Sequence, residues 1–193
     1  MKEHPILFSA PMVRAILEGR KTQTRRVMKP QPKEVQGGLR IYHDVDYKKS
    51  WESHPGSLQN EGYADCPYGQ PGDRLWVRET WRWTEGGGSG FRYRADGELK
   101  GPGKWKPSIH MPRIASRITL EIVSVRVERL RSIGEQDAEA EGVSMCHIDD
   151  LGTTWMSFVR GFQALWESIN GPDSWNANPW VWVVEFKKVE PCR

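Results

Sequence analysis

The chain has 193 residues, a formal net charge of +3 and three cysteines, which together exclude several classes of protein. A chain of this length buries a core without disulfides or metals, and we expect a single domain over 1–193. Cys66, Cys146 and Cys192 are odd in number and lack a C-x-x-C pair, so a disulfide framework and a zinc knuckle are not expected. The N-terminal apolar run is broken by prolines and is too short for a signal or membrane segment, which predicts a cytoplasmic protein.

The first predicted element is a helix. Pro11 stands where the first turn of a helix tolerates proline, the apolar residues of MVRAIL then share one helical face, and Gly19 is the expected end. Residues 30–65 are rich in glycine, proline and polar side chains with little periodicity. This composition predicts a long insertion or partly ordered loop rather than a second domain.

The middle of the chain favours strands. GDRLWVRETW opens with a Gly-Asp turn at 72–73 and then alternates like a half-buried strand. A glycine-rich loop at 84–90 follows, and FRYRAD at 91–96 is a second predicted strand. The longest alternating segment is 117–130. Its expected core residues are Ile118, Leu120, Ile122, Val125 and Val127.

The last third combines helices with a closing strand. An S-x-x-E capping box that ends at Glu135 predicts a short helix that stops at Gly142 and carries Glu141 in its last turn. Apolar residues at helical spacing predict a second helix over about 154–168. The β-branched and aromatic run 180–190 predicts a strand that completes a sheet. Without βαβ alternation, these elements predict an α+β fold, a small barrel decorated by helices.

Basic residues are unevenly distributed along the chain. They gather in 20–29, 74–83 and 113–131, so a weakly basic chain can carry a patch for a phosphate-bearing partner. The ten tryptophans allow two interpretations, core packing or stacking on nucleic-acid bases. His110 has no metal-ligand spacing to Cys66 or to another histidine, and we expect neither a metal nor a cofactor.

Four stretches, in this order and spacing, resemble the ASCH family of PUA-like domains: LEGRKTQTRR at 17–26, PGDRLWVRETW at 71–81, SIGEQDAEAEG at 132–142 and VWVVEFK at 181–187. The resemblance implies a PUA-like small mixed β-barrel with flanking helices. It leaves 30–65 and 84–107 as insertions, similar to those of the larger, prophage-associated members. PUA-like barrels host unrelated functions, so the function has to be argued from the site.

Small bacterial ASCH proteins are amidohydrolases that remove the acetyl group from N(4)-acetylcytidine with a threonine, a lysine and a glutamate. Their G-R-K-T-x-T motif falls on Lys21 and Thr24, and their A-E-x-E glutamate falls on Glu141. The residue types suit this chemistry, because a threonine hydroxyl needs a base and a desolvated lysine can be that base. Glu141 would orient the lysine or carry a proton to the leaving amine. The alternative is that all three are ordinary surface residues.

Contact between the side chains of Lys21 and Thr24 would require a particular backbone conformation. Residues three apart point to opposite faces of a strand. Cooperation between the two side chains therefore predicts a turn or bulge in the backbone here rather than a regular strand.

Five more residues are candidates for binding a ligand. Arg26 matches an arginine of the small enzymes and, like Arg25, can donate paired hydrogen bonds to a phosphate or a base carbonyl. Glu79 and Arg78 close a predicted strand, where Glu79 either faces the same cleft or pairs with an arginine. Arg113 belongs to a polar loop that leads into the long strand.

Two other functions are compatible with these residues. One is an RNA-binding module without catalysis, in which basic stretches hold phosphates and tryptophans stack on bases. The other is an ASCH-type ribonuclease, in which Lys21 and Arg26 stabilise a phosphorane and Glu141 is the acid or base. In every case the expected partner is a nucleoside or RNA and not a membrane.

Overall fold

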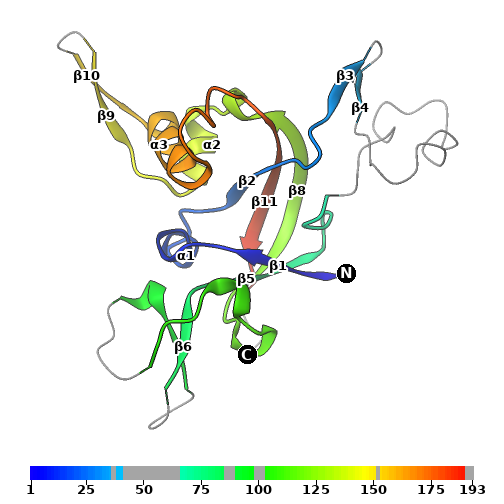
Figure 1. Cartoon of the computed structure of the whole chain (residues 1–193), viewed down its shortest axis with the longest axis vertical. Coiled ribbons are helices and arrows are strands. Elements are labelled where there is room, and N and C mark those ends of the chain that lie inside the picture. The colour runs from blue at the N-terminus through cyan, green and yellow to red at the C-terminus, as the bar shows by residue number, and fades with distance from the viewer. Residues whose placement is uncertain (36–37, 41–65, 85–89, 98–102, 151–152, 190–193) are drawn as a thin grey trace, which may run out of the picture.

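The centre of the molecule is a five-stranded mixed sheet with the order β1-β5-β8-β11-β2 (Figure 1). A computed structural model describes residues 1–35, 38–40, 66–84, 90–97, 103–150 and 153–189. β1 pairs in parallel with β5, and the other neighbouring strands are antiparallel. The five strands are β1 (Glu3–Leu7), β5 (Arg74–Arg78), β8 (Thr119–Arg129), β11 (Trp180–Lys188) and β2 (Gln23–Val27).

Three α-helices of the described residues accompany the sheet, and the α+β class predicted from the sequence is confirmed. They are α1 (Ala10–Leu17), α2 (Glu135–Ala140) and α3 (Phe158–Asn170). In Figure 1, α1 lies on one side of β2, and α2 and α3 lie on the other. Over the described residues β1 and β2 end the sheet without pairing with each other, so no closed barrel is formed there.

None of the helices in the described residues is long and apolar enough to cross a membrane.

Alternation along β11 divides the interior into two cores. Trp182, Val184 and Phe186 belong to a core with residues of β1, α1, β5 and β8, whereas Val181 and Val183 pack with α2 and α3. Direct partners across an antiparallel pair point to the same face. The register of β11 with β2 therefore places Thr24 and Arg26 on the α1 side and Arg25 on the side of α2 and α3.

A bulge in β8 explains why its expected core residues change from even to odd numbers. Phe186 pairs with Ile122 and Glu185 pairs with Ser124, so Val123 is an extra residue, and it is 51% exposed. Ile118, Leu120 and Ile122 are buried as predicted, and Val125 and Val127 are partly buried against the same core.

Three two-stranded hairpins and four short 3-10 helices complete the described part of the chain. The first predicted insertion contains the hairpin of β3 (Lys33–Val35) and β4 (Gly38–Arg40), whereas 41–65 lie outside the described residues. The second contains β7 (Phe91–Tyr93), which pairs with β6 (Trp81–Trp83). The predicted strand over 91–96 ends at Tyr93. The 3-10 helices are Arg94–Asp96, Ser108–His110, Arg113–Ala115 and Leu130–Ser132.

The predicted start of the helix expected over about 154–168 is wrong. Residues 154–157 belong to β10 (Thr153–Ser157), which pairs with β9 (Cys146–Asp150), and the helix begins at Phe158. The side chain of Ser157 accepts a hydrogen bond from the backbone N–H of Arg160 and caps the helix. Threonine and tryptophan before this cap suit a strand.

The capping box predicted for α2 is also wrong. Gly134 is the N-cap residue, and no side chain caps this helix. The Glu135 carboxylate instead accepts hydrogen bonds from the Ser157 hydroxyl at 2.6 Å and the Phe158 backbone N–H at 2.7 Å. Glu135 therefore joins the start of α2 to the start of α3.

Candidate functional site

The chain brings Lys21 and Glu141 together at the edge of the sheet. Glu141 is the C-cap residue of α2, and Lys21 lies two residues before the start of β2. The two residues form an isolated antiparallel bridge, and the Thr22 backbone N–H donates to the Ala140 carbonyl at 2.9 Å. Gly142 permits this approach, because a Cβ there would lie 2.7 Å from Cβ of Lys21 at a φ of +76°.

The Lys21 amine is buried and fully hydrogen-bonded. Its Nζ lies 2.8 Å from Oε2 of Glu141, 2.9 Å from the Glu141 carbonyl oxygen and 2.7 Å from the Gln23 carbonyl oxygen. These three acceptors match the three donors of an ammonium group. Burial lowers the pKa of Lys21, although the Glu141 carboxylate acts in the opposite direction. Lys21 therefore loses its proton more readily than an exposed lysine does.

Thr24 lies inside β2, opposite Val184, and its side chain is buried on the α1 side of the sheet. Lys21 stands outside the strand, so regular β-structure begins only between the two residues. Among the described contacts, no hydrogen bond joins the Thr24 hydroxyl to the Lys21 amine. The site thus contains a preformed lysine-glutamate pair with the threonine on the neighbouring strand.

Arg26 shares the α1 side with Thr24. Its guanidinium donates to the Leu7 carbonyl oxygen at 2.6 Å and lies 5.3 Å from the centroid of the Phe8 ring. The Lys21 amine lies 5.6 Å from the same ring. Nε of Arg26 is buried without a hydrogen-bond partner among the described residues. An unused buried donor suits a ligand that accepts hydrogen bonds.

Two aromatic residues of this region were not singled out from the sequence. Phe8 contacts both Lys21 and Arg26, and Tyr68 is close enough to Arg26 to influence its pKa, which burial lowers. The pKa of Tyr68 is raised by burial. The apolar run PILFS at 5–9 indicates that Phe8 is buried, but only the folded sheet places its ring beside Lys21 and Arg26.

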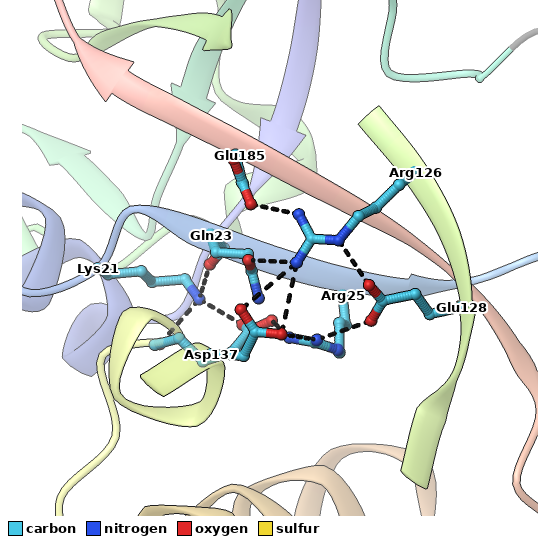
Figure 2. A network of polar contacts seen from close by, with 8 residues as sticks. Lys21, Gln23, Arg25, Arg126, Glu128, Asp137 and Glu185 are labelled. Carbon is cyan, nitrogen blue, oxygen red and sulfur yellow. Dashed lines mark hydrogen bonds and ion pairs between the residues drawn. The ribbon is translucent and has the colours of Figure 1, made fainter. Parts of the chain in front are cut away.

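Arg25 lies on the opposite face of β2, where its guanidinium forms ion pairs with three carboxylates. Its guanidinium contacts Oδ2 of Asp137 at 2.9 Å, Oε2 of Glu128 at 3.1 Å and Oε1 of Glu141 at 3.4 Å. Figure 2 shows that Arg126 extends this network to Gln23 and Glu185. Because Arg25 is fully buried within the network, its geometry suits holding α2 on the sheet better than binding a ligand.

The other three predicted site residues lie elsewhere. Glu79 is buried and accepts two hydrogen bonds from Arg117, at 2.9 Å and 3.2 Å. Burial raises the pKa of Glu79, while Arg117 lowers it. Arg78 and Arg113 flank the Trp76 ring at 5.3 Å and 5.8 Å. In the described part of the chain, none of the three contacts the Lys21–Glu141 pair.

A cleft of about 550 Å³ lies on the outer side of the bridge. Arg20, Thr22, Gln136 and Glu139 line it, but Lys21, Thr24 and Glu141 do not. Within the described ranges, no group of three His, Cys, Asp or Glu residues is arranged to hold a metal ion.

Comparisons with protein-family models, with characterised proteins and with solved structures each found no match.

Proposed function

We propose that this chain is an ASCH-type protein that binds a cytidine-like nucleoside and hydrolyses an acyl amide on its exocyclic amine. One observation carries this proposal, the 2.8 Å contact between Nζ of Lys21 and Oε2 of Glu141 across 120 positions of sequence. The resemblance assigns a role to both residues from two separate motifs. Thr24 is buried on the adjoining strand, which also supports the assignment.

The reaction requires a proton acceptor beside the threonine. In its neutral form Lys21 takes the Thr24 proton as the hydroxyl oxygen attacks the acyl carbonyl carbon. The carbon–nitrogen bond then breaks, the proton passes from Lys21 to the leaving amine, and the acyl group stays on Thr24 as an ester. Water next attacks the ester with Lys21 as base, which releases the carboxylic acid and restores the hydroxyl. Glu141 orients the amine throughout.

A shorter route gives the same products. Lys21 takes a proton from water, and the resulting hydroxide attacks the amide directly. Mass spectrometry of the protein during turnover separates the two routes, because only the first leaves an acyl group on Thr24. In both routes Arg26 binds the nucleoside through its unused Nε.

The PUA-like barrel and the cytoplasmic location belong to the same proposal. The bulge in β8 increases the local twist of the sheet, which is one way in which strands curl toward closure.

The test is release of acetate and cytidine from N(4)-acetylcytidine by the purified protein. We expect Thr24→Val and Lys21→Met to lower turnover by about a hundredfold or more. Thr22→Val is the matched control, because the exposed Thr22 joins the bridge only through its backbone. No turnover by the wild type, on the free nucleoside or on RNA that contains it, would overturn hydrolysis.

A second function is favoured by the three acceptors around the Lys21 amine. They suit a permanent ammonium, which would hold a nucleoside without acting as a base. Calorimetry that detects nucleoside binding while no acetate appears would select this binding function. Binding lost in Arg26→Met but kept in Thr24→Val would support it further.

A further inference from the structure

Glu141 divides its carboxylate between two buried cations. Oε2 contacts Nζ of Lys21 at 2.8 Å, and Oε1 contacts Nη1 of Arg25 at 3.4 Å. The side chains of Lys21 and Arg25 expose no surface, and that of Glu141 is buried as well. A change in the charge of Arg25 therefore reaches the amine through a carboxylate that the two cations share, in surroundings that screen charge poorly.

Ion pairs continue from Arg25 toward the solvent with charges that alternate in sign (Figure 2). Nη2 of Arg25 lies 2.9 Å from Oδ2 of Asp137 and 3.1 Å from Oε2 of Glu128. Arg126 contacts Asp137 at 3.4 Å and also pairs with Glu128 and Glu185. The exposed fraction of the side chains rises from zero at Arg25 to 34% at Asp137 and 38% at Glu185. The network thus connects the buried amine with the surface.

The sheet register explains how the two arginines of this network come together. Val183 of β11 pairs with Arg25 of β2 on one side and with Arg126 of β8 on the other, so both arginines share a face. Asp137 of α2 contacts both of them. Arginine does not release its proton in proteins, so the network cannot carry a proton to the amine. Its influence on the amine is electrostatic.

The charged groups that act on the Lys21 amine come from α2 and from both faces of β2. Burial lowers the pKa of Lys21, and the Glu141 carboxylate opposes this effect. The charges of Arg26 and Arg25 lower the pKa further. Arg25 differs from Arg26 because Asp137 compensates part of its charge. This compensation can be changed without altering the α1 side of the sheet.

We propose that Arg25 is a positioning residue for the Lys21 base: by sharing the Glu141 carboxylate, it weakens the attraction of that carboxylate for the ammonium, so that the amine is free to act as a base. Asp137 limits the effect, because it neutralises part of the charge of Arg25. The inference rests on the proposed function, in which Lys21 is the base. A purely structural network would not make removal of Arg25 and removal of Asp137 act on Lys21 in opposite directions.

The test is an NMR titration of the lysine ε-carbons in the isotope-labelled full chain, with the Lys21 signal assigned by its loss in Lys21→Met. Arg25→Met should raise the pH midpoint of Lys21 by about one unit, because a like charge is lost and the carboxylate is released. Asp137→Asn should lower the midpoint by about half a unit, since the lost charge is partly exposed. The matched control is Glu121→Gln, whose carboxylate is 35% exposed and pairs with Lys187, and it should keep the wild-type midpoint.

Arg25→Lys retains the positive charge and should stay close to the wild-type midpoint. A midpoint as high as that of Arg25→Met would overturn the proposal. So would shifts in the same direction in Arg25→Met and Asp137→Asn. If Arg25→Met is too unstable to titrate, the comparison of Asp137→Asn with Glu121→Gln decides, and equal midpoints in these two variants overturn the proposal.

Activity provides a second measurement. The acid limb of acetate release against pH should shift in parallel with the midpoint of Lys21, because only the neutral amine accepts a proton. If the wild type releases no acetate, the titration midpoints still decide the effect of Arg25 on Lys21. Failure of this inference is therefore distinct from failure of the proposed function.

Discussion

Arg25 and Arg26 are neighbours in β2, yet the two faces of the strand give them different surroundings. Arg25 is enclosed by three carboxylates on the side of α2 and α3. Arg26 contacts a backbone carbonyl and the Phe8 ring on the α1 side, where its Nε has no partner among the described residues. Nε of Arg25 also lacks a described partner, so the two faces differ in their carboxylates: one face surrounds its arginine with three, and the contacts described for Arg26 include none.

Glu141 is shared between the two faces, because Oε2 contacts Lys21 and Oε1 contacts Arg25. Glu141→Ala should therefore have the largest effect on stability, about 3–5 kcal/mol, since it leaves buried cations without their carboxylate. Urea unfolding measures this loss. The control is Glu139→Ala on the exposed side of α2, which should stay within about 0.5 kcal/mol of wild type. Equal losses in the two variants would contradict a structural role for the pair.

Matched substitutions at the neighbouring arginines test the comparison directly. Arg25→Met should cost about 3 kcal/mol, because it leaves Asp137, Glu128 and Glu141 facing one another. Arg26→Met should cost about 1 kcal/mol, the value of one hydrogen bond, but should weaken nucleoside binding. Unfolding and calorimetry on both variants provide the measurement. The distinction between the faces fails if Arg25→Met weakens binding without loss of stability.

The pH dependence of stability reports the burial of Lys21. Its pKa in the folded chain is lowered from the ordinary 10.5, so between these two values the unfolded chain holds a proton that the folded chain has released. The contribution of Lys21 to stability is then complete above the ordinary pKa and is lost as pH falls through the lowered one. Over this interval the wild type should gain stability relative to Lys21→Met as pH rises, by at most about 1.4 kcal/mol per pH unit. A flat difference in urea unfolding would contradict this.

Asp137→Asn should have the smallest effect of the series. Asp137 contacts both Arg25 and Arg126, but its side chain is 34% exposed, and water screens the charge that is lost. We expect a loss of about 0.5–1 kcal/mol with nucleoside binding unchanged. A larger loss than in Arg25→Met would show that Arg126, rather than Arg25, is the centre of the network.

The sequence predicted the elements better than their exact ends. Alternation located β5 and β8, and the β-branched and aromatic composition located β11. The change of the core residues in β8 from even to odd numbers, between Ile122 and Val125, is the sequence signature of the bulge. Two sequence signals were misassigned at helix starts. Ser157 caps α3 although the apolar pattern continues before it, and Glu135 bonds to a residue 22 positions away that no local pattern identifies.

The sequence identified residues of the candidate site, but not the face of β2 on which each side chain lies. The motif resemblance brought Lys21 and Glu141 to attention, and the structure places them in contact. The separation of Arg25 from Arg26 requires knowing that β2 has a core on both faces, which depends on β11 and the helices. Phe8 and Tyr68 could not be assigned because their role depends on packing between segments distant in sequence.

The hydrogen bonds from Ser157 and Phe158 to the Glu135 carboxylate tie the start of α3 to the start of α2, so the chain between these points forms a loop with fixed ends. The polypeptide leaves α2, forms β9 and β10, and returns to the point that Glu135 fixes. This anchor holds the starts of the two helices together independently of the hairpin between them. A reporter domain inserted between β9 and β10 should accordingly leave Glu141 in place.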